Sequence, residues 1–110
     1  MKLVAIFGAL LILSSCANLV KGGAVSDAEK LVNQGRFSKA LEKTEIAESF
    51  GELTPIEKAK LYFFRAQALE GLNRESEASG YYLYVAEQLE TNPYTQSAKF
   101  RYKQLSGSAE

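Results

Sequence analysis

Five segments of the chain place apolar residues at helical spacing, with polar residues between them. Short stretches that contain Gly, Asn or Pro separate these segments and provide the expected stops. The pattern predicts an all-α protein, with helices over residues 26–34, 38–50, 55–71, 75–90 and 93–105. In the second segment we expect an inward face made of Ala40, Leu41, Ala47 and Phe50.

Two helix starts carry a capping-box signature, in which a hydroxyl residue is followed three positions later by a glutamate. Ser26 with Glu29 forms one such pair, and Thr54 with Glu57 forms the other. Pro93 follows Asn92 at the predicted start of the last helix, where a missing backbone N–H does no harm. We therefore expect well-defined helix starts at all three places.

The chain resembles itself when it is shifted by 38 residues. Small residues then align with small ones, as in Ala28 with Ala66, and large ones with large ones, as in Leu31 with Leu69. Other aligned pairs are Arg36 with Arg74, Ser38 with Ser76, Ala40 with Ala78, and Pro55 with Pro93. Such self-similarity predicts two stacked helix hairpins and a C-terminal capping helix, the arrangement of an α-solenoid fragment. A plain five-helix bundle with a coincidental repeat is the alternative.

The residues of this repeat resemble tetratricopeptide repeats over residues 25–105. The matching positions of the first unit are Ala28, Leu31, Gly35, Phe37, Ala40 and Ala47. Those of the second unit are Tyr62, Ala66, Leu69, Ala78 and Tyr82, with Asn73 in the glycine position. The chain departs from the family in its period, which is 38 residues instead of about 34, and in Thr44 and Glu75, which replace aromatic residues.

The resemblance implies a concave face, lined by the first helix of each pair, that binds a peptide or a partner protein. By position, this partner-binding face would comprise Val25, Glu29, Val32, Asn33, Lys60, Phe63, Gln67 and Glu70. Val32 and Phe63 could instead be core residues, and Glu29 could serve only in capping. Consecutive aromatics cannot all face one interior, so we expect Phe64, one of Tyr81 and Tyr84, and Phe100 to be partly exposed or covered by another element.

The N-terminal residues have the pattern of a secretory signal peptide over residues 1–15. Lys2 precedes an apolar run over residues 3–13, and two serines follow. The run would rise only about 16 Å as a helix, too short to cross a hydrocarbon core of about 30 Å.

Leu13-Ser14-Ser15-Cys16 resembles the lipobox of bacterial lipoproteins. The resemblance implies that Cys16 becomes the first residue, carries acyl chains and binds the lipid bilayer. Residues 16–24 would then be the lipidated cysteine and its tether, and the small, polar residues 106–110 are expected to form a flexible tail. Ala17 stands where inner-membrane lipoproteins often carry aspartate, which favours an outer membrane facing the periplasm over an inner membrane or a Gram-positive surface. An ordinary signal peptide with an incidental cysteine is the alternative.

Charge and composition narrow the function further. Cleavage would remove Lys2, one of 13 Lys and Arg residues, and leave all 13 Asp and Glu residues, so there is no basic excess for nucleic acid. The chain has no histidine, one cysteine and no glycine-rich phosphate loop, so we expect no enzyme activity, no metal site and no cofactor.

These features together predict a membrane-anchored adaptor or scaffold in the bacterial envelope, with a protein partner. One alternative is a structural lipoprotein that forms homo-oligomers without a specific client. A weaker alternative is a carrier with a ligand pocket among Tyr62, Phe63, Tyr82 and Tyr102.

Overall fold

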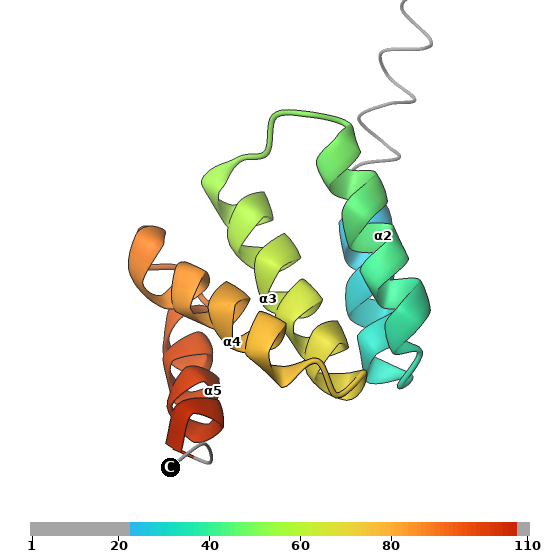
Figure 1. Ribbon diagram of the computed structural model, residues 1–110. Helices are drawn as coiled ribbons and strands as arrows, with labels where there is room; N and C mark the ends of the chain where they lie inside the picture. The colour runs from blue at the N-terminus through green and yellow to red at the C-terminus, as the bar shows by residue number, and fades with distance from the viewer. Residues whose placement is uncertain (1–22, 108–110) are drawn as a thin grey trace, which may run out of the picture.

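The computed structural model describes residues 23–107, and this part of the chain is helical apart from its turns. Residues 23–33 form the first helical segment, which Figure 1 shows in blue behind α2. The helices that follow are α2 (Phe37–Ser49), α3 (Pro55–Gly71), α4 (Glu75–Leu83), the short π-helix η1 (Tyr84–Gln88) and α5 (Thr95–Gly107). No strand occurs among the described residues. The predicted all-α fold class is confirmed.

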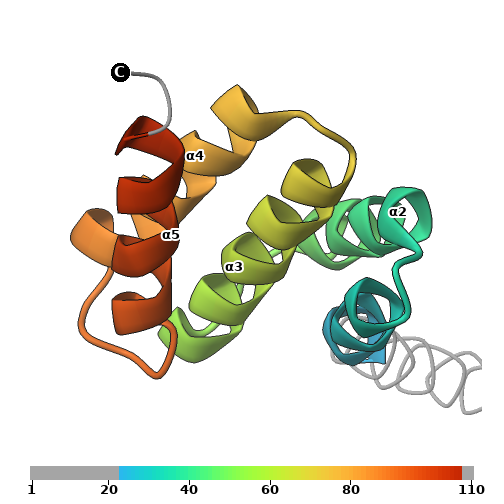
Figure 2. The same ribbon diagram turned by 90° about the horizontal axis from the view of Figure 1, so that it is seen from below.

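The central helix of the fold is α3. The main helix contacts join neighbours along the chain: α2 packs on α3, α3 packs on α4, and α4 with η1 packs on α5. Figure 2 shows residues 23–33 and α2 on one side of α3, with α4 and α5 on the other. Because α3 is covered from both sides, buried residues occur around most of its circumference between Ala59 and Leu69.

Alanines allow α2 and α3 to approach closely. Ala40, Ala47 and Ala68 are completely buried at this contact, where a larger side chain would force the helices apart. Larger residues fill the second half of the core, in which Phe63 contacts Tyr82 with a ring-centroid distance of 5.8 Å. The prediction that Phe50 faces the core is wrong. Helix α2 ends at Ser49, and Phe50 is 46% exposed in the turn that follows.

Phe64 is buried, and the element that covers it is the turn before α5. Its ring makes an edge contact with Tyr94 at 5.8 Å, and only 6% of the residue is exposed. Of the two outcomes expected for the surplus aromatics, burial by another element therefore applies to Phe64. Partial exposure applies to Tyr81 and Tyr84, and Phe100 is 60% exposed on α5.

Two turns of the fold have the same hydrogen-bond pattern 38 residues apart. Gly35 and Asn73 adopt left-handed conformations, with φ values of 74° and 62°. The residue after each donates its N–H to the carbonyl five positions earlier, closing the helix as a Schellman motif. These bonds are Arg36 N to Leu31 O at 2.8 Å and Arg74 N to Leu69 O at 2.9 Å.

One of the two predicted capping boxes is present. Thr54 accepts a hydrogen bond from the Glu57 N–H at 3.2 Å, and the Glu57 carboxylate accepts one from the Thr54 N–H at 3.0 Å. The box at Ser26 was wrong, because helical structure already includes residues 23–25. Ala24 and Val25 are buried against Ala47 and Leu61. This packing stabilises helical structure on the N-terminal side of Ser26, so Ser26 is not the first residue of the helix.

The predicted domain limits need one correction at each end of the described chain. Residues 23–24 belong to the first helical segment and not to the tether, because Ala24 is part of the core. At the other end, α5 continues to Gly107, so residues 106–107 are helical and not part of a tail. The predicted signal peptide and Cys16 lie outside the described residues.

Candidate functional site

The eight residues of the predicted partner-binding face fall into three groups. Val25 and Phe63 are only 4% and 7% exposed, so both belong to the core and neither lines a surface groove. Glu29 and Lys60 form an ion pair at 3.3 Å between the first helical segment and α3. The remaining four residues, Val32, Asn33, Gln67 and Glu70, line one recess of about 340 Å³. The structure therefore brings half of the predicted face together.

Polar contacts cross this recess between α3, α4 and α5. The Glu70 carboxylate accepts a hydrogen bond from the Tyr82 hydroxyl at 3.0 Å and also pairs with the guanidinium of Arg101. Glu70 raises the pKa of Arg101 and, after burial, contributes to the raised pKa of Tyr82. These groups satisfy one another, which makes the recess a structural junction more than an open binding surface.

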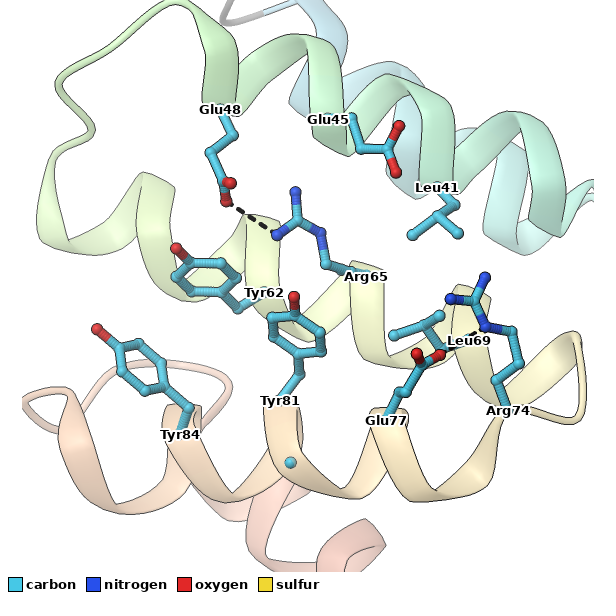
Figure 3. A pocket seen from close by; sticks show the side chains of 11 residues that line it. Leu41, Glu45, Glu48, Tyr62, Arg65, Leu69, Arg74, Glu77, Tyr81 and Tyr84 are labelled. Carbon is cyan, nitrogen blue, oxygen red and sulfur yellow. Dashed lines mark hydrogen bonds and ion pairs between the residues drawn. The ribbon is translucent and has the colours of Figure 1, made fainter.

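A larger cleft lies between α2 and α4, with α3 as its floor (Figure 3). Its volume is about 690 Å³, roughly twice that of the recess. Tyrosine rings gather at one end, and Leu41 and Leu69 lie at the other (Figure 3). The cleft is lined by Leu41, Glu45, Glu48, Tyr62, Arg65, Leu69, Arg74, Glu77, Gly80, Tyr81 and Tyr84.

Arg65 is the most deeply buried charged residue in the cleft. It projects from α3 toward α2, where its Nε donates to the Thr44 hydroxyl at 3.1 Å and its Nη1 donates to the Glu48 carboxylate at 2.9 Å. The guanidinium also lies 5.4 Å from the ring centre of Tyr62 and 5.3 Å from that of Tyr81, within cation–π range. Arg65 thus joins all three helices that form the cleft.

Three tyrosines form the aromatic end of the cleft. Tyr62 of α3 stacks on Tyr81 at 5.6 Å and meets the edge of Tyr84 at 5.2 Å. Burial raises the pKa of Tyr62, and the nearby Glu48 carboxylate raises it further. The Tyr62 hydroxyl therefore stays protonated at physiological pH, and its ring offers an amphipathic wall.

The other end of the cleft is open and carries mixed charge. Arg74 and Glu77 pair at 2.5 Å on the exposed surface of α4, and this hydrogen bond lowers the pKa of Glu77 and raises that of Arg74. Glu45 projects from α2 into the cleft (Figure 3) and makes no hydrogen bond or ion pair with the other described residues. It is the one carboxylate in the cleft that makes no ion pair with the described residues, although its charge contributes to the raised pKa of Arg74.

Gly80 provides unfilled space in the cleft wall. It lies within α4, is exposed, and a Cβ built there would meet no atom within 4 Å. Glycine in a helix interior destabilises it by about 0.5–1 kcal/mol relative to alanine. Packing inside the described part of the chain does not explain this glycine, so the space beside it remains available to another molecule.

Sequence reasoning missed this cleft because Arg65 lies 21 residues from Thr44 and 17 residues from Glu48, and meets them only in the fold. The signal was the surplus of tyrosines at positions 81 and 84, which pointed to an interface without locating it. The predicted ligand pocket is not formed as one cavity: Tyr62 lines the cleft, Tyr82 lines the recess, and Phe63 is buried between other rings.

No protein-family model, curated protein or solved structure matches this chain. Over residues 23–107, none of the helices is both long enough and apolar enough to cross a membrane. Within the same residues, no cluster of three or more acidic, histidine or cysteine side chains is placed to hold a metal ion.

Proposed function

We propose that the protein is a lipid-anchored adaptor of the bacterial envelope, and that the cleft between α2 and α4 binds a segment of a partner protein. Cys16 would carry the anchor, with the outer membrane facing the periplasm as the favoured location. The lipobox-like sequence at residues 13–16 supports the anchor. The partner site is supported by the cleft of about 690 Å³.

The observation that carries the partner site is the open space at Gly80 in the α4 wall of the cleft, next to Tyr81 at the aromatic end. Rigid tyrosines provide large contact area with few torsions to order, as in many protein interfaces. Arg65 fixes the floor, so the cleft exists before a partner arrives and little ordering would be needed on binding.

The chemistry of the cleft also limits what fits it. Glu45 lies near Leu41 and Leu69 at the end away from the tyrosines; it makes no ion pair with the described residues, and its charge acts on Arg74 only at longer range. We propose that the bound segment presents a lysine or arginine to Glu45 beside a small or apolar side chain at Gly80. Such a segment would match the cleft in both charge and shape.

We further propose that the helices form a tetratricopeptide-like solenoid fragment of two hairpins and a capping helix. The support comes from the two equivalent Schellman turns at Gly35 and Asn73 and from the packing of helices on their chain neighbours. In this arrangement the recess containing Gln67 and Glu70 would be the concave face, and the cleft would lie on the opposite side.

Site-specific photocrosslinking in cells tests the partner site. A photoreactive residue at Glu77, which is exposed at the cleft, should give one adduct with a heterologous protein. The same residue at Lys99, exposed on α5, is the matched control and should give none. Gly80→Leu places a bulky side chain where a Cβ meets open space and should abolish the adduct. Persistence of the adduct in Gly80→Leu, or an equal adduct from position 99, would exclude the cleft.

The anchor has a separate test. Cys16→Ser should move the protein out of the membrane fraction or leave it unprocessed. A processed Cys16→Ser protein that still fractionates with membranes would rule out the lipid anchor.

Self-association is the second candidate, because Phe100 is 60% exposed on α5, the last helix of the fold. It predicts that photocrosslinking yields only adducts between copies of this chain, and that Phe100→Ser removes them.

A further inference from the structure

The first helical segment places the start of the described chain at one end of the molecule. Ala24 and Val25 are buried against Ala47, near the end of α2, and against Leu61 in the first half of α3. Figure 1 shows the blue start of the chain behind α2, toward the end where α2 connects to α3. Any anchor attached before residue 23 must therefore leave the fold from this end.

The length of chain before this point limits how far the fold can stand from an anchor at Cys16. The seven residue steps from Cys16 to Gly23 span at most about 25 Å even when fully extended. A tether of this length keeps its attachment point on the fold within about 25 Å of the acylated Cys16. The end that carries the α2–α3 connection must stay close to the membrane.

Exposed apolar side chains gather at this same end. Phe50, Ile56 and Phe100 are the large hydrophobic residues exposed in the described part of the chain, and two of them flank the α2–α3 connection. Phe50 is 46% exposed just after α2, and Ile56 is 62% exposed in the first turn of α3. We call residues 50–56 the apolar tip.

We propose that the apolar tip enters the interface of the bilayer that holds the Cys16 anchor, with Phe50 and Ile56 as the inserting side chains. This inference rests on the proposed lipid anchor and adds a second, direct contact between the fold and the lipid. The charges of Glu52 and Glu57 outweigh that of the nearby Lys58, so the tip has no excess of positive charge to attract anionic lipids. We therefore expect its apolar side chains to bind an uncharged lipid surface. The Cys16 anchor and the apolar tip together would fix the orientation of the domain, so that the cleft always faces the same way relative to the membrane.

The test uses two features of the sequence: the chain has no tryptophan, and Cys16 is its only cysteine. Phe50→Trp, Ile56→Trp and Phe100→Trp therefore each give a single fluorescent reporter in the full protein. Phe100 is the matched control, because it is as exposed as Ile56 but lies on α5. The acylated protein is reconstituted into phosphatidylcholine vesicles; where cells yield unacylated protein, a maleimide lipid is coupled to Cys16.

Tryptophans at positions 50 and 56 should be quenched by brominated lipids and shielded from aqueous acrylamide, with little effect of salt. Tryptophan at position 100 should show the reverse, with several-fold stronger acrylamide quenching. Equal acrylamide quenching at all three positions would overturn the inference. Shielding at positions 50 and 56 without lipid quenching would also overturn it, and would assign the tip to a second copy of this chain.

The mass of the Cys16 peptide from cells, acylated or not, is read separately. This mass shows whether Cys16 is acylated, whereas the vesicle measurement shows whether the apolar tip enters the bilayer. Failure of the proposed anchor is therefore distinguishable from failure of the proposed insertion.

Discussion

Glu48 neutralises Arg65 from the neighbouring helix, accepting a hydrogen bond of 2.9 Å from a guanidinium whose side chain is only 7% exposed. Glu48 itself remains 47% exposed, so water can solvate it when the pair is broken. The two partners are thus unequal: Arg65 depends on Glu48 more than Glu48 depends on Arg65.

This inequality predicts that Glu48→Gln destabilises the fold by about 1–2 kcal/mol, because it leaves a buried cation with a weaker acceptor. Adding Arg65→Met should recover most of that loss, since the charge is then removed and the apolar stem is kept. Urea unfolding followed by circular dichroism measures both, with Glu42→Gln on the exposed face of α2 as the control. A double variant whose losses simply add would contradict the pairing.

Two helical glycines should respond in opposite directions to alanine. Gly80→Ala should raise the free energy of unfolding by about 0.5–1 kcal/mol, because the added methyl group meets open space. Gly71→Ala should lower it by about 1–3 kcal/mol, because its Cβ would overlap the Phe37 ring. Thermal and urea unfolding compare the two, and Phe37→Ala should remove the penalty at position 71. The same sign for both variants would refute this account.

Tyr82 should make the stability fall at high pH. Burial raises the pKa of its hydroxyl, and Glu70 raises it further, so the folded state keeps Tyr82 protonated where the unfolded chain ionises. A raised pKa leaves stability intact below the unfolded value of about 10, and stability is lost as the pH rises above it.

Tyr82→Phe should therefore flatten the loss of stability above pH 10, while costing about 1 kcal/mol near neutral pH through the lost hydrogen bond to Glu70. Urea unfolding across this pH range provides the measurement. Tyr102→Phe, at a partly buried tyrosine on α5, is the control and should leave the alkaline loss in place. An unchanged slope in Tyr82→Phe would show that other groups cause it.

The two capping signatures predict different effects of the same kind of substitution. Thr54→Ala removes a cap that is present and should cost about 1 kcal/mol, whereas Thr54→Ser should retain most of it. Ser26→Ala should have little effect, because Ser26 lies inside a helix and is exposed. Unfolding experiments on the three variants decide the matter, and an equal loss at both positions would mean that Ser26 also caps.

Local signals in the sequence predicted the elements well where the physics is local. Thr54 and Glu57 lie three residues apart and form their capping box within a single turn, and Gly35 and Asn73 close their helices as their conformational preferences indicate. The capping box predicted at Ser26 was wrong, because burial of Ala24 and Val25 against other helices outweighs the stability that a local cap would provide.

The sites could not be predicted because they depend on contacts between helices. Nothing near Arg65 in sequence indicates that Thr44 and Glu48 will enclose it, and nothing near Phe64 indicates that Tyr94 will cover it. Gln67 and Glu70 of the predicted face line a recess, but helical position alone could not separate them from the buried Phe63.

The packing of each helix on its neighbour in the chain has a consequence for how the protein folds. Contacts of this kind are short in sequence, and chains dominated by them fold in microseconds to milliseconds. Only α3 packs on both α2 and α4, so an early folding nucleus must contain it to link the two halves. Because folding is expected to be fast, a chain that reached a membrane surface unfolded would expose its tyrosines and phenylalanines only briefly, and would have little time to aggregate.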